Sequence, residues 1–313
     1  RIKVLAMAVL GLTLSCTAQT SKKMSDAYAD GRFGLSFELF PPKTEAGEEV
    51  LFKHLKRLIA FDPSYITCTY GAGGSTQAKT LEIIDRVQKA YDCMVASHLT
   101  CVGLSRNALI HFLQEASQRN INNIVALRGD PPQGADSFEP PEDGLRYASE
   151  LVTLIRDAFP EFGIAVAGYP ETHREAESPE SDLENLQRKV ALGGDLVITQ
   201  LFYDNADFFR FQQLCSDRGI EVPIVPGILP VTNLAQIQRI SGLCGAILPR
   251  DFEDELSACG EDSEKQFEVG VRFAIDQVND LIDRGVPGIH FYVLNKSDAT
   301  ARILESVRVP TQS

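Results

Sequence analysis

Short apolar runs alternate with longer amphipathic segments from about residue 35 to the end of the chain. The apolar runs are rich in β-branched and aromatic residues and predict eight strands, at Leu35–Phe40, Tyr65–Tyr70, Met94–Thr100, Asn123–Arg128, Ile164–Tyr169, Leu196–Phe202, Val222–Ile228 and Gly288–Leu294. Apolar residues three or four positions apart predict helices at Glu48–Ala60, Gln77–Ala90, Arg106–Arg119, Arg146–Ala158, Ser181–Leu192, Ala206–Arg218 and Glu264–Arg284. This βα alternation is typical of a parallel sheet covered by helices.

Eight near-continuous apolar strands joined by helical crossovers favour an α/β fold, a closed (β/α)₈ TIM barrel. A doubly wound open sheet is the alternative, but it calls for a GxGxxG turn after an early strand. The chain instead has GAGGS at residues 71–75, after the second strand. The long interval between the seventh and eighth strands predicts extra helices at Asn233–Leu243 and Asp251–Cys259.

Length and composition agree with one barrel domain, because such barrels often exceed 250 residues. The 313 residues include 44% hydrophobic and 23% charged residues, which is the balance of a globular enzyme. The net charge of −13 argues against nucleic-acid binding and favours a small-molecule substrate. Seven cysteines without CxxC spacing suggest neither a disulfide framework nor a zinc site, and indicate a reducing compartment.

The first residues have a basic start, a short apolar run and small residues, which is the shape of a signal peptide. The apolar run is too short to span a membrane as a helix. Met24 opens an independent start, and the unpaired cysteines argue against export. We therefore expect residues 1–23 to be a non-structural extension, and 24–313 to form a single catalytic domain in the cytoplasm.

Polar residues fall at the ends of seven of the eight predicted strands. In barrels of this type the chemistry takes place at the carboxyl ends of the strands, so these residues are site candidates. Each could also have an ordinary structural role, such as a local ion pair or a satisfied core imidazole. They are Glu38, Thr69, His98, Arg128 with Asp130, Tyr169 with His173, Gln200, and Tyr292 with Lys296.

Glu38 is the sharpest candidate, because Phe37 and Phe40 flank it and Pro41-Pro42 ends the strand just beyond. A carboxyl group in an apolar pocket has a raised pKa, which suits a general acid near neutral pH. The alternative is a buried glutamate tied to an arginine or lysine.

Two further segments suggest ligand contacts. Gly129, between Arg128 and Asp130, allows a flat or phosphorylated ligand to approach the backbone. Asp182, Asn185 and Lys189 share one predicted helix face, with Arg188 at its edge. This face is either exposed to solvent or binds ribose hydroxyls and a pyrophosphate.

Two other reaction classes fit poorly. Metal-assisted hydrolysis needs several ligands on converging strands, and the first strand carries no HxH. A Schiff-base aldolase needs a lysine on a strand, whereas Lys43 and Lys296 lie beyond strand ends and Lys189 on a helix.

The motifs together resemble the bacterial-type methylenetetrahydrofolate reductases, and the resemblance runs in order from about residue 33 to 307. It is carried by SFELFPPK at 36–43, TYGA at 69–72, HLTC at 98–101, ALRGD at 126–130, YPE at 169–171, ITQLF at 198–202, PGILP at 226–230 and HFYVLN at 290–295. It covers the catalytic barrel alone, so a C-terminal regulatory domain is not expected.

The resemblance implies a barrel that binds FAD, takes hydride from NADH or NADPH and passes it to 5,10-methylenetetrahydrofolate. Glu38 matches the acid that activates the folate, and Asp130 the acidic residue beside the flavin that also meets the pterin. Gln200 and Gln236 match folate contacts. Flavin-contacting positions fall on Tyr70, Ala72, His98, Arg128, Gly129, Ala148, Tyr169, His173, Ala176, Asp182, Asn185, Arg188 and Lys189, and a nicotinamide-side position on Thr69.

Two positions depart from many relatives. Lys296 stands where an arginine is common and keeps the charge without the planar fork, so its contact with the folate tail is in doubt. Ile240 stands where some relatives stack a phenylalanine on the nicotinamide.

Three hypotheses follow: the reductase, an idle flavin or folate carrier, and another flavin barrel enzyme such as one that oxidises proline. Glu38, Asp130 and Gln200 argue against the carrier, and the RGDPP turn against the third. We expect folate and pyridine nucleotide as partners, a homo-oligomer, and neither metal, nucleic acid nor membrane.

Overall fold

Parallel strands form one sheet that curls into a nearly closed barrel. The computed structural model describes residues 22–70, 77–130 and 139–310. Its strands are β1 (Gly34–Leu39), β2 (Tyr65–Cys68), β3 (Val95–Thr100), β4 (Asn123–Leu127), β5 (Gly163–Gly168), β6 (Leu196–Thr199), β7 (Ile224–Val225), β8 (Gly227–Ile228) and β9 (Gly288–Tyr292). Their order in the sheet is β7-β6-β5-β4-β3-β2-β1-β9-β8.

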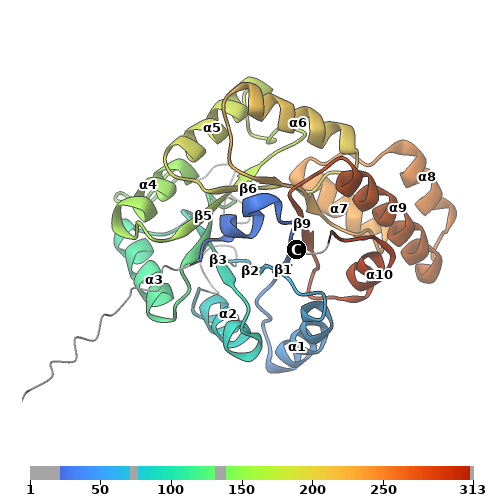
Figure 1. Ribbon diagram of the computed structural model, residues 1–313, viewed down its shortest axis with the longest axis horizontal. Helices are drawn as coiled ribbons and strands as arrows, with labels where there is room; N and C mark the ends of the chain where they lie inside the picture. Colours follow the sequence, from blue (N-terminus) through green and yellow to red (C-terminus); the bar gives the residue numbers. More distant parts are fainter. Residues whose placement is uncertain (1–21, 71–76, 131–138, 311–313) are drawn as a thin grey trace, which may run out of the picture.

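Helices surround the strands as an outer ring (Figure 1). They are α1 (Glu45–Ile59), α2 (Gln77–Tyr91), α3 (Arg106–Gln118), α4 (Ala148–Ala158), α5 (Pro179–Ala191), α6 (Asn205–Asp217), α7 (Leu234–Cys244), α8 (Arg250–Ala258), α9 (Ser263–Asp283) and α10 (Asp298–Ser306). The predicted (β/α)₈ barrel is thereby confirmed, and the doubly wound alternative is wrong.

The predicted seventh strand is present in two parts, β7 and β8, which Pro226 separates. β7 pairs with β6, whereas β8 pairs with β9, so the broken strand links the two ends of the sheet. Proline has no N–H group for the ladder. The next N–H group, of Gly227, donates to Thr199 Oγ1 at 3.0 Å. The break thus follows from the sequence Pro226-Gly227 inside an otherwise apolar run.

Several predicted helices begin one to three residues earlier than their apolar patterns indicate, and α5 shows the reason. α5 begins at Pro179 rather than Ser181, because Ser178 caps it and accepts a hydrogen bond from the Ser181 N–H group at 3.1 Å. Proline in the first turn lacks only an N–H group that would have had no partner there.

The extra helices between the last two strands are α7 and α8, followed by the long α9. They pack around a separate apolar cluster that includes Leu229, Val231, Ile237, Phe252 and Leu256. In Figure 1 α8 lies farthest from the centre of the barrel. This small core also contains Leu201, Tyr203 and Tyr292, so it attaches α7 and α8 to the ends of β6 and β9.

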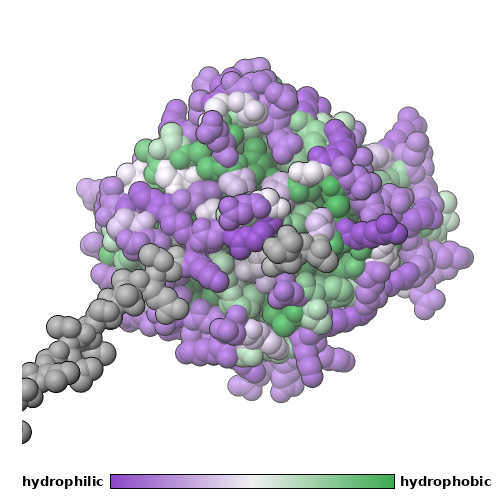
Figure 2. Space-filling view, viewed as in Figure 1, coloured by the Kyte–Doolittle hydropathy of each residue, from purple (hydrophilic) through white to green (hydrophobic). Residues whose placement is uncertain are grey.

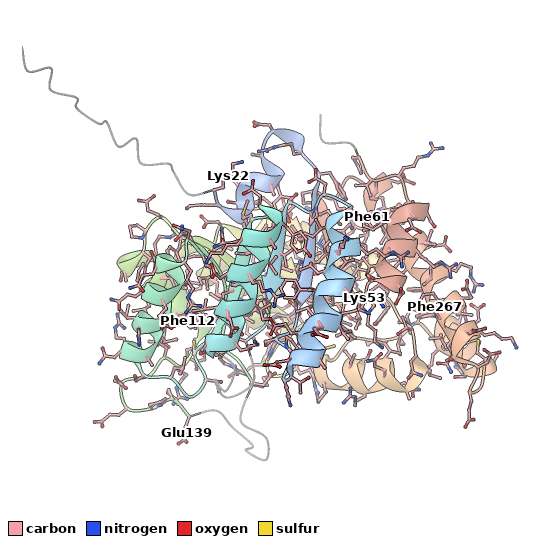
Figure 3. The ribbon with its side chains drawn as sticks, turned by 90° about the horizontal axis from the view of Figure 1, so that it is seen from below. Lys22, Lys53, Phe61, Phe112, Glu139 and Phe267 are labelled. Carbon is pink, nitrogen blue, oxygen red and sulfur yellow. The ribbon has the colours of Figure 1, made fainter. Side chains whose placement is uncertain are left out.

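A short 3₁₀ helix, η1 (Met24–Gly31), closes the amino-terminal end of the barrel and was not predicted. It lies across the middle of the barrel in Figure 1 and at one end in Figure 3, where Lys22 and Glu139 mark opposite ends. Met24 and Tyr28 pack on the inward side chains of the strands, including Tyr65. A segment this short shows too little periodicity to be recognised from sequence.

Residues 1–21 lie outside the described residues, so the prediction of a non-structural extension stays a prediction. The two residues that follow make specific contacts. The Lys22 carbonyl accepts a hydrogen bond from Asn123 Nδ2 at 3.1 Å, and Lys23 pairs with Asp195 at 3.3 Å.

The main core lies between the strands and the helix ring, and a second apolar layer fills the inside of the barrel beneath η1. On the face that carries η1 the surface is largely hydrophilic (Figure 2). Among the described residues, no helix is long and apolar enough to cross a membrane.

Two helical glycines in the α7–α9 region give a matched stability test. A β-carbon at Gly270, in α9, would overlap the carbonyl oxygen of Val231, whereas one at Gly242, in α7, meets no atom within 4 Å. We expect Gly270→Ala to lower the free energy of unfolding by about 3 kcal/mol. Gly242→Ala should raise it by up to about 1 kcal/mol. Urea unfolding of both variants checks this, and equal effects would contradict the packing described.

Candidate active site

Most of the predicted site residues lie at or just beyond the carboxyl ends of the strands, opposite η1. Glu38 on β1 is in register with Thr67 on β2 and Tyr292 on β9. Its side chain is buried, as is that of His98 on β3. Side chains that are far apart in sequence thus meet inside the mouth of the barrel.

Two histidines, from different strands, face the Glu38 carboxylate. Oε2 of Glu38 lies 3.2 Å from Nε2 of His98 and 3.7 Å from Nε2 of His290. Burial alone would raise the pKa of the carboxyl group, but the imidazoles, His98 foremost, outweigh it and lower the pKa to about 2. The expectation of a raised pKa is therefore wrong. Its physical reason is that the imidazoles, rather than the neighbouring phenylalanines, determine the electrostatics.

His290 was not predicted as a site residue. Its Nδ1 lies 2.8 Å from Ser36 Oγ, and Ser36 is hydrogen-bonded in turn to Tyr65. The hydroxyls of Tyr65 and Tyr28 are 2.7 Å apart. A buried polar chain thus runs from η1 to Glu38 and fixes the His290 ring. Strand alternation could have revealed it, because Ser36 and Glu38, like His290 and Tyr292, are two positions apart.

The β4–α4 turn has the charge arrangement that the sequence suggested, with one additional partner. The Arg128 guanidinium forms a bidentate pair with Glu175, at 2.6 and 2.8 Å. Gly129 has φ 88°, and a β-carbon there would lie 3.0 Å from the side chains of Thr100 and Val102. Only glycine fits this turn comfortably. Asp130 is exposed and makes no ion pair with the described residues.

The predicted polar face of α5 divides into a packed half and an exposed half. Asp182 Oδ2 accepts a hydrogen bond from the His173 N–H group at 2.9 Å, and Lys189 Nζ donates to the Ala167 carbonyl at 2.6 Å. Burial lowers the pKa of Lys189 to about 8, although Asp182 opposes the shift. Asn185 and Arg188 are exposed.

The other predicted cofactor-binding residues lie after β2, at the start of α4 and in the β5–α5 loop. Tyr70 is buried against Phe112, and its hydroxyl has no partner among the described residues. Thr69 follows β2 and donates its N–H group to the Leu39 carbonyl. Ala148 begins α4, and Ala176 lies in the β5–α5 loop. Ala72 lies outside the described residues.

Apart from Asp130, the predicted folate contacts come from three parts of the chain. Gln200 directly follows β6, and its Oε1 accepts a hydrogen bond from the Leu201 N–H group at 2.9 Å. It shares a hollow with Tyr169, Glu171, Cys244 and Gly245. Gln236 and Ile240 are partly buried on α7, whereas Lys296 is exposed beyond β9. No distance ties Lys296 or Gln236 to Glu38, so their role rests on the resemblance.

A metal centre finds no support in the described residues. Within residues 22–70, 77–130 and 139–310, no group of three or more His, Cys, Asp or Glu side chains could hold a metal ion.

Comparison with known proteins gives the family. The sequence model described as methylenetetrahydrofolate reductase matches residues 23–308. The chain is 37% identical to the 5,10-methylenetetrahydrofolate reductase of Pectobacterium carotovorum subsp. carotovorum, covering 90% of this chain and 93% of that protein. It is 38% identical to methylenetetrahydrofolate reductase (NADH) 1 of Zea mays, over 93% of this chain but 51% of the relative. The chain thus spans about half the length of the plant relative.

A solved structure supports the fold. It is described as an uncharacterized protein from Clostridium thermocellum that binds two copies of 5-methyl-5,6,7,8-tetrahydrofolic acid. The TM-score is 0.61 at 16% identity, covering 90% of this chain and 98% of that one. The extent of the sequence match, over a barrel with the expected strand-end residues, confirms the resemblance, and the chain belongs to the methylenetetrahydrofolate reductase family.

Proposed function

We propose that the protein reduces 5,10-methylenetetrahydrofolate to 5-methyltetrahydrofolate with NADH or NADPH, and so supplies methyl groups for methionine synthesis. The observation that carries this proposal is the family match over residues 23–308, together with the buried Glu38 carboxylate at the mouth of the barrel. The solved relative that binds two methyltetrahydrofolate molecules supports a folate ligand for such a barrel.

The residues at the strand ends fit a flavin. Tyr70 offers a buried hydroxyl without a partner among the described residues, and Gly129 gives the turn after β4 the positive φ that its close packing requires. Lys189, Arg128 and Arg188 supply positive charge for a pyrophosphate, and Asp182 and Asn185 can accept or donate hydrogen bonds to ribose hydroxyls. Bound FAD would supply the hydride carrier between the two substrates.

Glu38 is assigned the role of general acid toward the folate. The lowered pKa leaves the Glu38 carboxylate charged, 3.2 Å from Nε2 of His98. A folate that covers the mouth would displace water from the pair. Desolvation disfavours the charged carboxylate, so the Glu38 carboxyl group can hold a proton in the covered site. Glu38 can then deliver the proton that opening of the methylene bridge requires.

The folate and the nicotinamide are proposed to use the same site in turn, in a ping-pong sequence. Gln200 and Asp130 would orient the pterin, Gln236 would contact the folate, and Lys296 would meet its acidic tail. Thr69 and Ile240 lie on the nicotinamide side, where Ile240 offers aliphatic contact. The cytoplasmic location and the homo-oligomer stay predictions, and gel filtration of the purified protein tests the second.

The cofactor is expected to be FAD. The cluster Asp182, Asn185, Arg188 and Lys189 offers more polar groups than the single phosphate of FMN needs. Purified protein should be yellow and should release FAD on heating, which chromatography identifies. Release of FMN would contradict the role assigned to α5, and a colourless protein that binds neither flavin would contradict the proposed reductase itself.

The activity is tested by NAD(P)H oxidation that depends on added methylenetetrahydrofolate, with 5-methyltetrahydrofolate as the product. Flavin bleaching by NAD(P)H without any folate turnover would instead favour another flavin barrel oxidoreductase.

A further inference from the structure

The β5–α5 loop makes side-chain contacts with two other parts of the chain within five residues, 171–175. Glu171 Oε1 accepts a hydrogen bond from the N–H group of Ile247 at 2.9 Å. Arg174 Nη1 donates to the carbonyls of Gly242 and Leu243, at 2.5 and 3.0 Å. Glu175 binds the Arg128 guanidinium. The loop therefore connects the flavin-side turn after β4 with the end of α7.

Arg174 donates hydrogen bonds to two carbonyl groups at the end of α7 that cannot find a partner within the helix. The last four carbonyls of a helix lack partners within it, and a cation there also interacts favourably with the helix dipole. Gly245 ends α7 with φ 84°. A β-carbon at Gly245 would lie 2.7 Å from Arg174 Cγ. Glycine is thus required both by the backbone turn and by the close approach of the arginine.

Glu171 holds the next segment from the same loop. Its half-buried carboxylate binds the Ile247 N–H group two residues beyond Gly245. Between the two clamping residues, Thr172 has φ 73°. Positive φ is unfavourable for a β-branched residue, so surrounding contacts must hold this conformation. The contacts of Glu171, Arg174 and Glu175 flank Thr172 on both sides.

The carboxyl-terminal end of α7 is the part whose apolar side chains are exposed. The buried side of α7 packs on a small apolar cluster that it shares with α8 and with Leu201, Tyr203 and Tyr292 of the barrel, whereas Leu243 and Ile247, at and just beyond its end, are 71% and 70% exposed. The same helix carries Gln236 and Ile240. Its orientation relative to Gln200 and Tyr169 should therefore depend on the hollow where Glu171, Cys244 and Gly245 meet those two residues.

We propose that Arg174, with Glu171, is a positioning residue that sets α7 against the barrel mouth and thereby determines folate affinity. This inference rests on the proposed function. Because Glu175 and His173 lie in the same loop, the proposal also links the flavin side of the site to the folate side.

The test compares Arg174→Ala, Arg174→Lys and the control Arg302→Ala in the holoenzyme. Arg302 is also an exposed arginine with two hydrogen bonds, but it binds Glu268 on α9. Folate binding is titrated through the flavin spectrum without NAD(P)H, using 5-methyltetrahydrofolate as the probe. Arg174→Ala should raise the Kd roughly fivefold, the effect of losing a cation at an exposed helix end. Arg174→Lys should keep part of the affinity that Arg174→Ala loses. The control Arg302→Ala should bind the probe as tightly as the wild type does.

Two further measurements separate positioning from general destabilisation. Amide exchange in residues 234–248 should accelerate in Arg174→Ala but not in Arg302→Ala. Glu171→Gln keeps an acceptor oxygen for Ile247 and should bind folate normally, whereas Glu171→Ala should behave like Arg174→Ala. An unchanged Kd in both alanine variants would overturn the proposal. If wild-type holoenzyme fails to bind the folate probe at all, the proposed function fails instead.

Discussion

Glu38→Gln should retain FAD and still accept hydride from NAD(P)H, yet reduce the folate at least about 100-fold more slowly. The substitution keeps the shape and a hydrogen-bonding side chain near His98 and His290. It removes the carboxyl group that is proposed to carry the transferable proton to the folate. Only the folate half-reaction needs a proton delivered in its transition state, so only that half should suffer.

Stopped-flow measurement of each half-reaction separates the two effects. Glu48→Gln is the matched control, because Glu48 is also a largely buried carboxylate but pairs with Lys79 and Arg86 between α1 and α2. Glu48→Gln should have a lower free energy of unfolding than the wild type, but the rates of both half-reactions should be unchanged. Equal damage to both half-reactions in Glu38→Gln would mean that Glu38 is structural.

The barrel could be predicted because its evidence is local. Each strand is a short apolar run, and each crossover shows helical periodicity, so the order of elements follows from patterns within windows of about 15 residues. The failures occurred where a single residue changes the geometry. Pro226 splits the seventh strand, and Pro179 with Ser178 moves the start of α5. η1 was missed because its eight residues, interrupted by non-helical Ala29 and Asp30, are too few to show a period.

The site was predicted less completely, because its electrostatics depend on residues far apart in sequence. Glu38 and His98 were identified as strand-end residues, but not as neighbours, and His290 lies 252 positions beyond Glu38. Flanking phenylalanines suggested a raised pKa, whereas the two imidazoles lower it. The clamp formed by Arg174 carries no sequence signal at all, since its acceptors are main-chain carbonyls 68 and 69 positions away.

Asp130→Asn should raise the midpoint potential of the bound flavin and slow folate reduction. A carboxylate close to the isoalloxazine disfavours the negative charge gained on reduction. Arg128 does not neutralise it through an ion pair, since the guanidinium is engaged by Glu175. Removing one charge close to the ring should change the free energy of flavin reduction by on the order of 1–3 kcal/mol, which corresponds to some tens of millivolts for a two-electron couple.

The potential is measured by equilibrating the holoenzyme with a reference dye. Asp195→Asn is the control, because it removes a carboxylate at the opposite end of the barrel, where Asp195 pairs with Arg156 and Lys23. Its potential should match that of the wild type. A flavin that holds its electrons more firmly is a weaker hydride donor, so Asp130→Asn should reduce the folate more slowly even at saturating substrate. If the potential of Asp130→Asn does not move while folate affinity falls, Asp130 lies away from the ring and serves the folate alone.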